Sequence, residues 1–238
     1  MSTLTLIRHG QASPFQKETD VLSPLGERQA IALGEYWLKQ GDTFDEVYTG
    51  MLVRQSRTEE LVAERFRQAG APWPQSQATT AWNEYDATGI LTRFVPELAK
   101  LDERFAALVS AFEAARGTPD QNRHFQRMFE IAMMQWLEAN IEIEGVEPFH
   151  SFEHRVTGAL AALMSRPESR RVVVFTSGGP MGLLVRHALQ APARSFLEVN
   201  WRVRNTSMTE FLFSPSRFSL DSFNRLPHLT DRKMFSFR

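Results

Sequence analysis

Three consecutive residues near the N-terminus could do chemistry: Arg8, His9 and Gly10. An arginine holds an anion with paired hydrogen bonds, and an imidazole acts as a nucleophile or base near neutral pH. Glycine lets the backbone turn and approach a ligand closely. The apolar run at 4–7 is typical of a buried strand, and open α/β sheets bind ligands beyond such strand ends. The segment predicts an anion site; the alternative is a solvated arginine beside a structural histidine.

Two further arginines could contribute to such a site. Arg54 and Arg57 lie in a segment that is predicted to enter a helix running to about residue 68. The N-terminus of a helix favours anions, so either guanidinium could help to bind an anion there. The alternative is that both arginines are solvated cations on the helix surface.

A carboxylate is expected beside the site after a short strand at 77–82. Glu84 lies between the aromatic residues Trp82 and Tyr85, and Asp86 follows. Burial in apolar company would raise the pKa of a carboxyl group and suit it to donate a proton. Glu84 and Asp86 are both candidates for this role, and an exposed turn carboxylate is the alternative for both.

The clearest buried strand in the chain, at 171–175, runs into Thr176, Ser177, Gly178 and Gly179. A helix is expected from there to about residue 189. A strand, a glycine turn and a helix together offer free backbone amides to an anion. The spacing of a P-loop or of a dinucleotide-binding fingerprint is absent.

Other segments supply the elements that would position these residues. Ser23 and Pro24 are typical of a helix start and Gly41 of its end. A strand is expected at 44–48, a helix at 148–165, and a hairpin formed by 205–213 and 217–223. From about residue 91 to residue 139 the apolar residues recur at helical spacing, which predicts packed helices.

The composition narrows the class of protein. The chain has 238 residues, a formal net charge of −1 and no cysteine. The near-neutral charge gives no field that would attract nucleic acid or an acidic membrane. The lack of cysteine excludes disulfides, thiolate zinc sites and cysteine-nucleophile phosphatases. No apolar run approaches the roughly 20 residues of a membrane span, and no signal peptide is recognisable. We expect a cytoplasmic protein without nucleic-acid or membrane partners.

These segments together resemble the histidine phosphatase superfamily, also called phosphoglycerate mutase-like. Arg8-His9-Gly10 looks like its signature after the first strand. Residues 22–30 resemble its pattern Leu-Thr/Ser-x-x-Gly-x-x-Gln-Ala, and residues 49–58 its Ser-x-Pro-Leu-x-Arg-Ala-x-Gln-Thr. Residues 152–156 resemble Phe-x-x-Arg-Val, and residues 205–209 resemble Asn-x-Ser-x-Thr. The motifs occur in the family's order.

The resemblance implies a three-layer α/β/α sandwich with a mostly parallel central sheet. It also implies a single domain over 1–238, in which a helical insertion at about 86–147 caps the active site. The expected activity is metal-independent hydrolysis of a small phosphomonoester, with no cofactor. His150 and His154 could face one way, but no third ligand is evident, so no metal site is predicted.

The roles implied by the resemblance map onto individual residues. His9 would attack phosphorus and form a phosphohistidine, and Glu84 would protonate the leaving oxygen. The phosphoryl group would be bound by Arg8, by Arg54 and by the turn at 177–178.

Ser177 departs from the family pattern Ser/Thr-His-Gly-Gly, because it replaces the second histidine. Losing one well-placed donor costs on the order of 3 kcal/mol, or about 10² to 10³ in rate. Two hypotheses follow: a phosphatase of reduced activity, and an impaired member that binds phosphorylated ligands without turnover. The sequence carries no signal for the oligomeric state or for the particular substrate.

Overall fold

A computed structural model of the chain describes residues 1–12, 20–138, 141–166 and 169–237. They form two compact units, one of Met1–Glu84 with Arg155–Arg238 and a helical one of Tyr85–His154. Most of the polar segment 11–21, which the sequence predicts to be a loop, lies outside the described residues. No helix among the residues described is long and apolar enough to cross a membrane.

The first unit is built on a mixed six-stranded sheet in the order β3-β2-β4-β1-β5-β6. Neighbours among β3, β2, β4 and β1 pair in parallel, whereas β5 is antiparallel to both β1 and β6. Arg8 in β1 pairs with Thr176 in β4, so the two strands deliver the residues that follow them to one edge. The strands are β1 (Ser2–Arg8), β2 (Glu46–Thr49), β3 (Ser76–Ala78), β4 (Arg171–Thr176), β5 (Met208–Ser214) and β6 (Arg217–Arg225).

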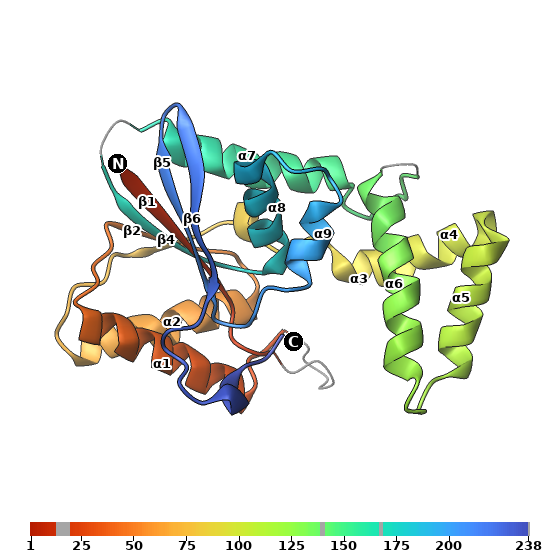
Figure 1. The fold of residues 1–238 in the computed structure, drawn as a ribbon, viewed down its shortest axis with the longest axis horizontal. Coiled ribbons are helices and arrows are strands. Elements are labelled where there is room, and N and C mark those ends of the chain that lie inside the picture. The colour runs from red at the N-terminus through yellow and green to blue at the C-terminus, as the bar shows by residue number, and fades with distance from the viewer. Residues whose placement is uncertain (13–19, 139–140, 167–168, 238) are drawn as a thin grey trace. The chain divides into compact units, whose positions relative to one another are not determined.

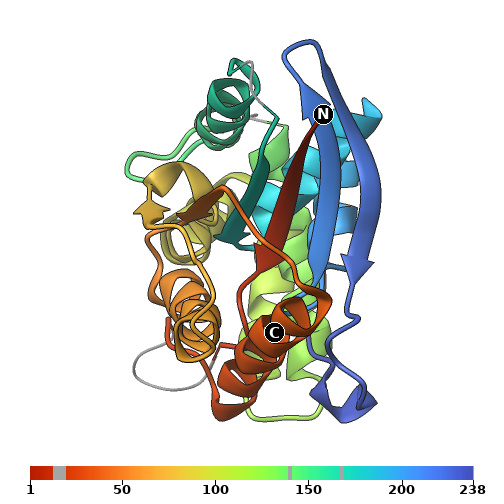
Figure 2. The same ribbon diagram turned by 90° about the vertical axis from the view of Figure 1, so that its left-hand side faces the viewer.

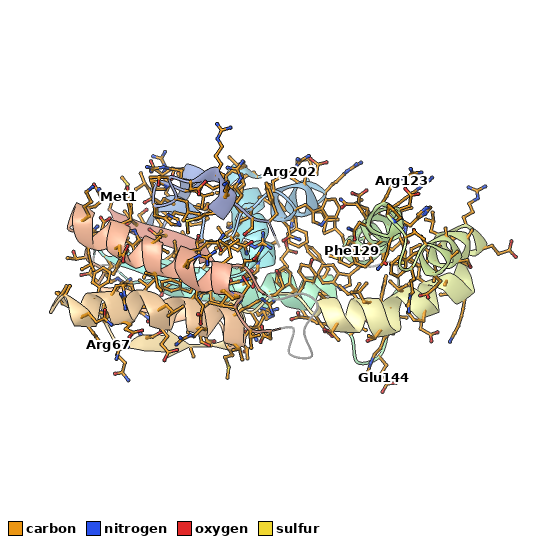
Figure 3. The ribbon with its side chains drawn as sticks, turned by 90° about the horizontal axis from the view of Figure 1, so that it is seen from below. Met1, Arg67, Arg123, Phe129, Glu144 and Arg202 are labelled. Carbon is orange, nitrogen blue, oxygen red and sulfur yellow. The ribbon has the colours of Figure 1, made fainter. Side chains whose placement is uncertain are left out.

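Helices cover both faces of this sheet, which gives the expected three layers (Figures 1 and 2). One face carries α1 and α2, which lie side by side in Figure 3, where the label Arg67 marks the end of α2. The other face carries α8 and the end of α7. The C-terminal segment lies beside α1 (Figure 2). The helices are α1 (Pro24–Gln40), α2 (Val53–Gln68), α7 (Phe149–Met164), α8 (Gly178–Leu189), α9 (Ser195–Asn200) and the 3₁₀ turns η1 (Thr80–Trp82) and η3 (Arg232–Met234).

The sheet is apolar on both faces, as parallel sheets covered by helices are. Side chains of a strand alternate between faces, so Ile7 joins the layer of α1 and α2 while Leu4 and Leu6 face the other way, and all three are fully buried. The core under α1 and α2 consists of Ile7, Leu33, Trp37, Val47, Val62, Phe66, Val173, Phe175 and Met208.

The predicted limits of α1 are confirmed in detail. The Ser23 side chain accepts a hydrogen bond from the Gly26 amide at 3.0 Å. Gly41 ends the helix with a φ of 72°, a left-handed conformation that favours glycine. The strand expected at 77–82 is wrong in its second half: β3 ends at Ala78, and the Thr79 side chain caps the turn η1 instead. Helix α9 was not predicted.

The second unit is helical throughout its regular structure. Its elements are α3 (Ala87–Gly89), the π-turn η2 (Ile90–Phe94), α4 (Val95–Leu101), α5 (Glu103–Ala114) and α6 (Gln121–Leu137), followed by the start of α7. The π-turn precedes Pro96, whose missing amide hydrogen cannot continue the regular α ladder. Tyr85, Trp136, Phe149 and Phe152 pack as an aromatic cluster, so this unit has its own apolar core.

Candidate active site

The carboxyl end of β1 places His9 in a buried position with a fixed backbone. The His9 residue is 6% exposed to solvent. Its amide donates to the Thr176 carbonyl of β4 at 2.9 Å, and its carbonyl accepts from the Asn205 side chain at 3.1 Å. The next amide, of Gly10, donates to the Thr58 hydroxyl at 2.9 Å. The main chain around His9 is therefore held from three separate segments.

The hydrogen bonds of the His9 ring assign its tautomer. Nδ1 lies 2.7 Å from the Gly10 carbonyl oxygen, which only accepts, so Nδ1 carries the proton. Nε2 lies 3.1 Å from Nε of Arg54, which only donates, so Nε2 is unprotonated. The lone pair of Nε2 is the group that a nucleophilic histidine requires.

The surroundings of His9 keep its imidazole neutral. Burial, together with the positive charges of Arg54 and Arg8, holds the pKa of His9 well below its usual range, although the hydrogen bond to Gly10 acts in the opposite direction. Arg54 is itself oriented by Asp20, whose carboxylate lies 2.5 Å from Nη1. Arg8 donates to the Val203 carbonyl.

The structure brings Arg54 to His9 and leaves Arg57 elsewhere. Arg57 lies three residues further along α2 and forms ion pairs with Glu60 at 2.6 Å and Glu27 at 3.6 Å. Its side chain is 39% exposed, against 19% for Arg54. Of the two candidates, only Arg54 contacts the imidazole.

Ser177 and Gly178 follow β4, next to His9 across the parallel pair of strands. Ser177 is fully buried, and its Oγ accepts from the Gln55 side chain at 2.8 Å. Ser177 occupies the N-cap position of α8 without capping it. Gly178 lacks a side chain for a reason of packing, because a Cβ there would lie 2.4 Å from Oδ1 of Asn200.

Glu84 lies at the same edge of the sheet. Its Oε1 accepts from the Gly179 amide in the first turn of α8 at 2.9 Å. The segment before Glu84 is anchored by Arg155, whose guanidinium donates to the carbonyls of Thr80, Ala81, Asn83 and Glu84 at 2.8–3.2 Å.

Asp86, the other carboxylate candidate, makes a structural contact at the start of a helix. Its Oδ1 accepts from the Gly89 amide at 2.8 Å and caps α3. No group of three or more His, Asp or Glu side chains is placed to hold a metal ion in the described part of the chain.

Sequence reasoning missed three contacts of this site. Asp20 orients Arg54, Arg155 anchors the Glu84 segment, and Gln55 contacts Ser177. The signal for Gln55 was present, because the motif that residues 49–58 resemble has alanine at that position. Gly10 was expected to approach a ligand, but a Cβ there would lie 2.5 Å from the Gly26 carbonyl oxygen at the start of α1. Packing against α1 is thus sufficient reason for this glycine.

A comparison with protein families finds a match over most of the chain. The model of the histidine phosphatase superfamily (branch 1) matches residues 4–87 and 111–226. The chain belongs to this superfamily.

Solved structures share the fold at low sequence identity. A Bacillus stearothermophilus protein, YhfR, is 19% identical with a TM-score of 0.66, over 96% of this chain and 99% of that one. The phosphoglycerate mutase of Bacillus anthracis is 18% identical with a TM-score of 0.64, over 95% and 94%. An Entamoeba histolytica phosphoserine phosphatase solved with 3-phosphoglyceric acid is 20% identical with a TM-score of 0.62, over 96% and 99%.

Proposed function

We propose that the chain is a metal-independent phosphomonoester hydrolase that acts through His9. The observation that carries this proposal is the neutral imidazole whose Nε2 lone pair lies beside Arg54, with Arg8 as a second nearby cation. Membership of the histidine phosphatase superfamily supports the reaction class.

In the proposed reaction, Nε2 of His9 attacks phosphorus, a P–N bond forms, and the bond from phosphorus to the leaving oxygen breaks. Glu84 gives its proton to that oxygen. Water then attacks the phosphohistidine, Glu84 takes a proton from it, and cleavage of the P–N bond releases phosphate and neutral His9. Nδ1 keeps its proton throughout and donates it in a hydrogen bond to the Gly10 carbonyl, and this contact orients the ring.

The cations have a second role in this proposal. In the structure, Nε of Arg54 donates to the same nitrogen that must attack. When the substrate binds, one of its phosphoryl oxygens accepts the Arg54 hydrogen bond in place of His9. This exchange frees the lone pair of His9 Nε2 and places the positive charge of Arg54 against the phosphoryl group. Arg8, Ser177 and the Gly178 amide complete the proposed set of phosphate contacts.

The substrate class that we propose is a small phosphorylated metabolite. Two solved structures with this fold are phosphoserine phosphatases in complex with phosphoserine and with 3-phosphoglyceric acid. We propose that the helical unit Tyr85–His154 is the variable insertion that the family resemblance implies.

A second candidate function is phosphoester binding without turnover. It is favoured by Ser177, a neutral and fully buried hydroxyl where the family resemblance implies a second histidine. The two candidates differ in one result, because only the hydrolase releases phosphate.

The test is hydrolysis of an aryl phosphate in the presence of a chelator by the wild type, by His9→Ala and by His187→Ala. His187 is an exposed histidine in the last turn of α8 and serves as the matched control. We expect hydrolysis to vanish in His9→Ala and to persist in His187→Ala. Hydrolysis that persists in His9→Ala contradicts the proposal, and a wild type that binds phosphate without releasing it from any phosphoester in a wide screen favours the second candidate.

A further inference from the structure

We propose that Gln55 is a positioning residue for Ser177: its side-chain amide fixes the serine hydroxyl so that the hydroxyl proton is offered to the phosphoryl group. This inference rests on the proposed function. It assigns a task to a residue of α2 that lies between Arg54 and the Gly10 contact, Thr58.

The contacts of Gln55 fix its side chain completely. The residue is fully buried. Its Nε2 donates to Ser177 Oγ at 2.8 Å and to the Trp82 carbonyl at 3.1 Å, which uses both hydrogens of the amide. Its Oε1 faces the Leu52 amide at 3.3 Å, and a Cβ on Gly50 would lie 1.9 Å from the same oxygen. The amide therefore has one place and one orientation.

The same contacts determine what the serine hydroxyl does. A hydroxyl has one proton and two lone pairs, and Gln55 uses a lone pair of Ser177. The Trp82 carbonyl, a nearby acceptor, is already bonded by Thr176 Oγ1 at 2.6 Å and by Gln55. Among the described residues, no acceptor takes the Ser177 proton. The hydroxyl is left as an oriented donor at the end of β4, next to the end of β1 that carries His9.

The usual alternative for a serine at this position does not occur. An N-cap serine normally accepts from an amide in the first turn of its helix, but Ser177 makes no such contact with α8. Gln55 holds the oxygen that would cap the helix, and the Gly179 amide is bonded by Glu84 instead. The Gln55–Ser177 pair thus acts as one unit that presents a single neutral donor.

A double-mutant cycle tests this unit on the full chain. The variants are Gln55→Ala, Ser177→Ala and the double variant, with Gln55→Met as a form of similar side-chain length that lacks the donor. The readouts are kcat and KM for an aryl phosphate, together with the Kd of orthovanadate by calorimetry, since vanadate binding needs no turnover.

We expect Ser177→Ala to lower kcat by about 10²-fold with little change in KM. Gln55→Ala and Gln55→Met each lower kcat by roughly tenfold in the presence of Ser177 and have no effect once Ser177 is alanine. Losses that multiply in the double variant, or a Gln55→Met variant with wild-type kcat, overturn the inference.

Vanadate separates the failure of this inference from the failure of the proposed function. If the wild type hydrolyses no phosphoester, the inference still predicts that Gln55→Met weakens vanadate binding only while Ser177 is present. Equal weakening with and without Ser177 overturns the inference whether or not the enzyme turns over.

A coupled substitution provides a second test. Because Gln55 fills the space against the buried Ser177, an imidazole at position 177 has no room beside it. We expect Ser177→His to lower the melting temperature and the activity, and Gln55→Ala to relieve both defects when combined with it. A Ser177→His variant that is stable and more active in the presence of Gln55 contradicts the proposed packing.

Discussion

Arginines cluster at both ends of the parallel strands, but they lie beside a different kind of side chain at each end. At the amino end, Arg166 and Arg170 contact the carboxylate of Glu46 at 2.9 and 2.6 Å. At the carboxyl end, Arg8 and Arg54 flank the imidazole of His9. Similar cations therefore meet an acid at one end of the sheet and a base at the other.

The difference lies in what the cations do to each partner. Burial would raise the pKa of Glu46, but hydrogen bonds from Tyr48 and Arg170 and the charge of Arg166 lower it overall. At the other end, burial and the two arginines lower the pKa of His9 well below its usual range. The amino end is an ion-pair network that stabilises the fold. At the carboxyl end, the cations keep the lone pair of His9 Nε2 unprotonated, as a nucleophile requires.

The largest effect is expected from Glu84→Gln, because it removes the proposed acid from the carboxyl end. With an alkyl phosphate, whose leaving oxygen needs a proton, kcat/KM falls by about 10²- to 10⁴-fold. With p-nitrophenyl phosphate, whose leaving group departs as an anion, the loss is much smaller. Equal losses on the two substrates contradict the role. Asp86→Asn is the control. Because Asp86 caps α3, we expect this substitution to change kcat/KM for both substrates by a similar factor.

Arg54→Gln comes next. Losing one donor to the developing phosphoryl charge lowers kcat by about 10²- to 10³-fold. Arg57→Gln, at the exposed ion pairs with Glu60 and Glu27, is expected to change kcat little. Steady-state kinetics on one aryl phosphate compares the two variants. Similar losses in both would erase the distinction between the two arginines.

The same Arg54→Gln variant also tests the effect of the arginines on the pKa of His9. Arg54 is one of the cations that lower the pKa of His9, so its removal raises that pKa towards the ordinary value of about 6.5. NMR titration of ¹⁵N-labelled histidine measures the change. The wild-type His9 should stay neutral at pH values where free histidine is protonated. A His9 that titrates alike in both proteins contradicts the account.

The smallest effect is expected at the amino end. Arg170→Met removes the shorter of the two arginine hydrogen bonds to Glu46 Oε1 and lowers the free energy of unfolding by about 1–3 kcal/mol. Arg166→Met, at the more exposed ion pair, costs under about 1 kcal/mol. Urea unfolding measures both, and kcat should remain unchanged. A loss of kcat in Arg170→Met without unfolding would show that the amino end also serves catalysis.

Local patterns predicted much of the fold. The apolar runs gave β1 and β4, and Ser23, Pro24 and Gly41 gave the limits of α1, because each depends on residues close in sequence. Helix α9 and the early end of β3 were missed. In the second case the Thr79 side chain, which the strand pattern does not weigh, begins a turn.

The residue types of the candidate site could be predicted from the sequence, whereas the contacts between these residues could be predicted only in part. The strand-end rule placed Arg8 and His9, but the choice of Arg54 over Arg57 needed the position of α2 against β1. The Gln55–Ser177 contact joins residues 122 positions apart. Such contacts depend on strand register and helix packing, which no local pattern contains.

The central claim is that His9 accepts the phosphoryl group. The most direct measurement mixes the wild type rapidly with a ³²P-labelled phosphomonoester that it hydrolyses, stops the reaction in alkaline detergent, and maps the label by digestion and mass spectrometry. The account predicts an acid-labile phosphoryl group on His9 during turnover and none in His9→Ala. Phosphate release without any labelled enzyme intermediate, or a label on another residue, would contradict it.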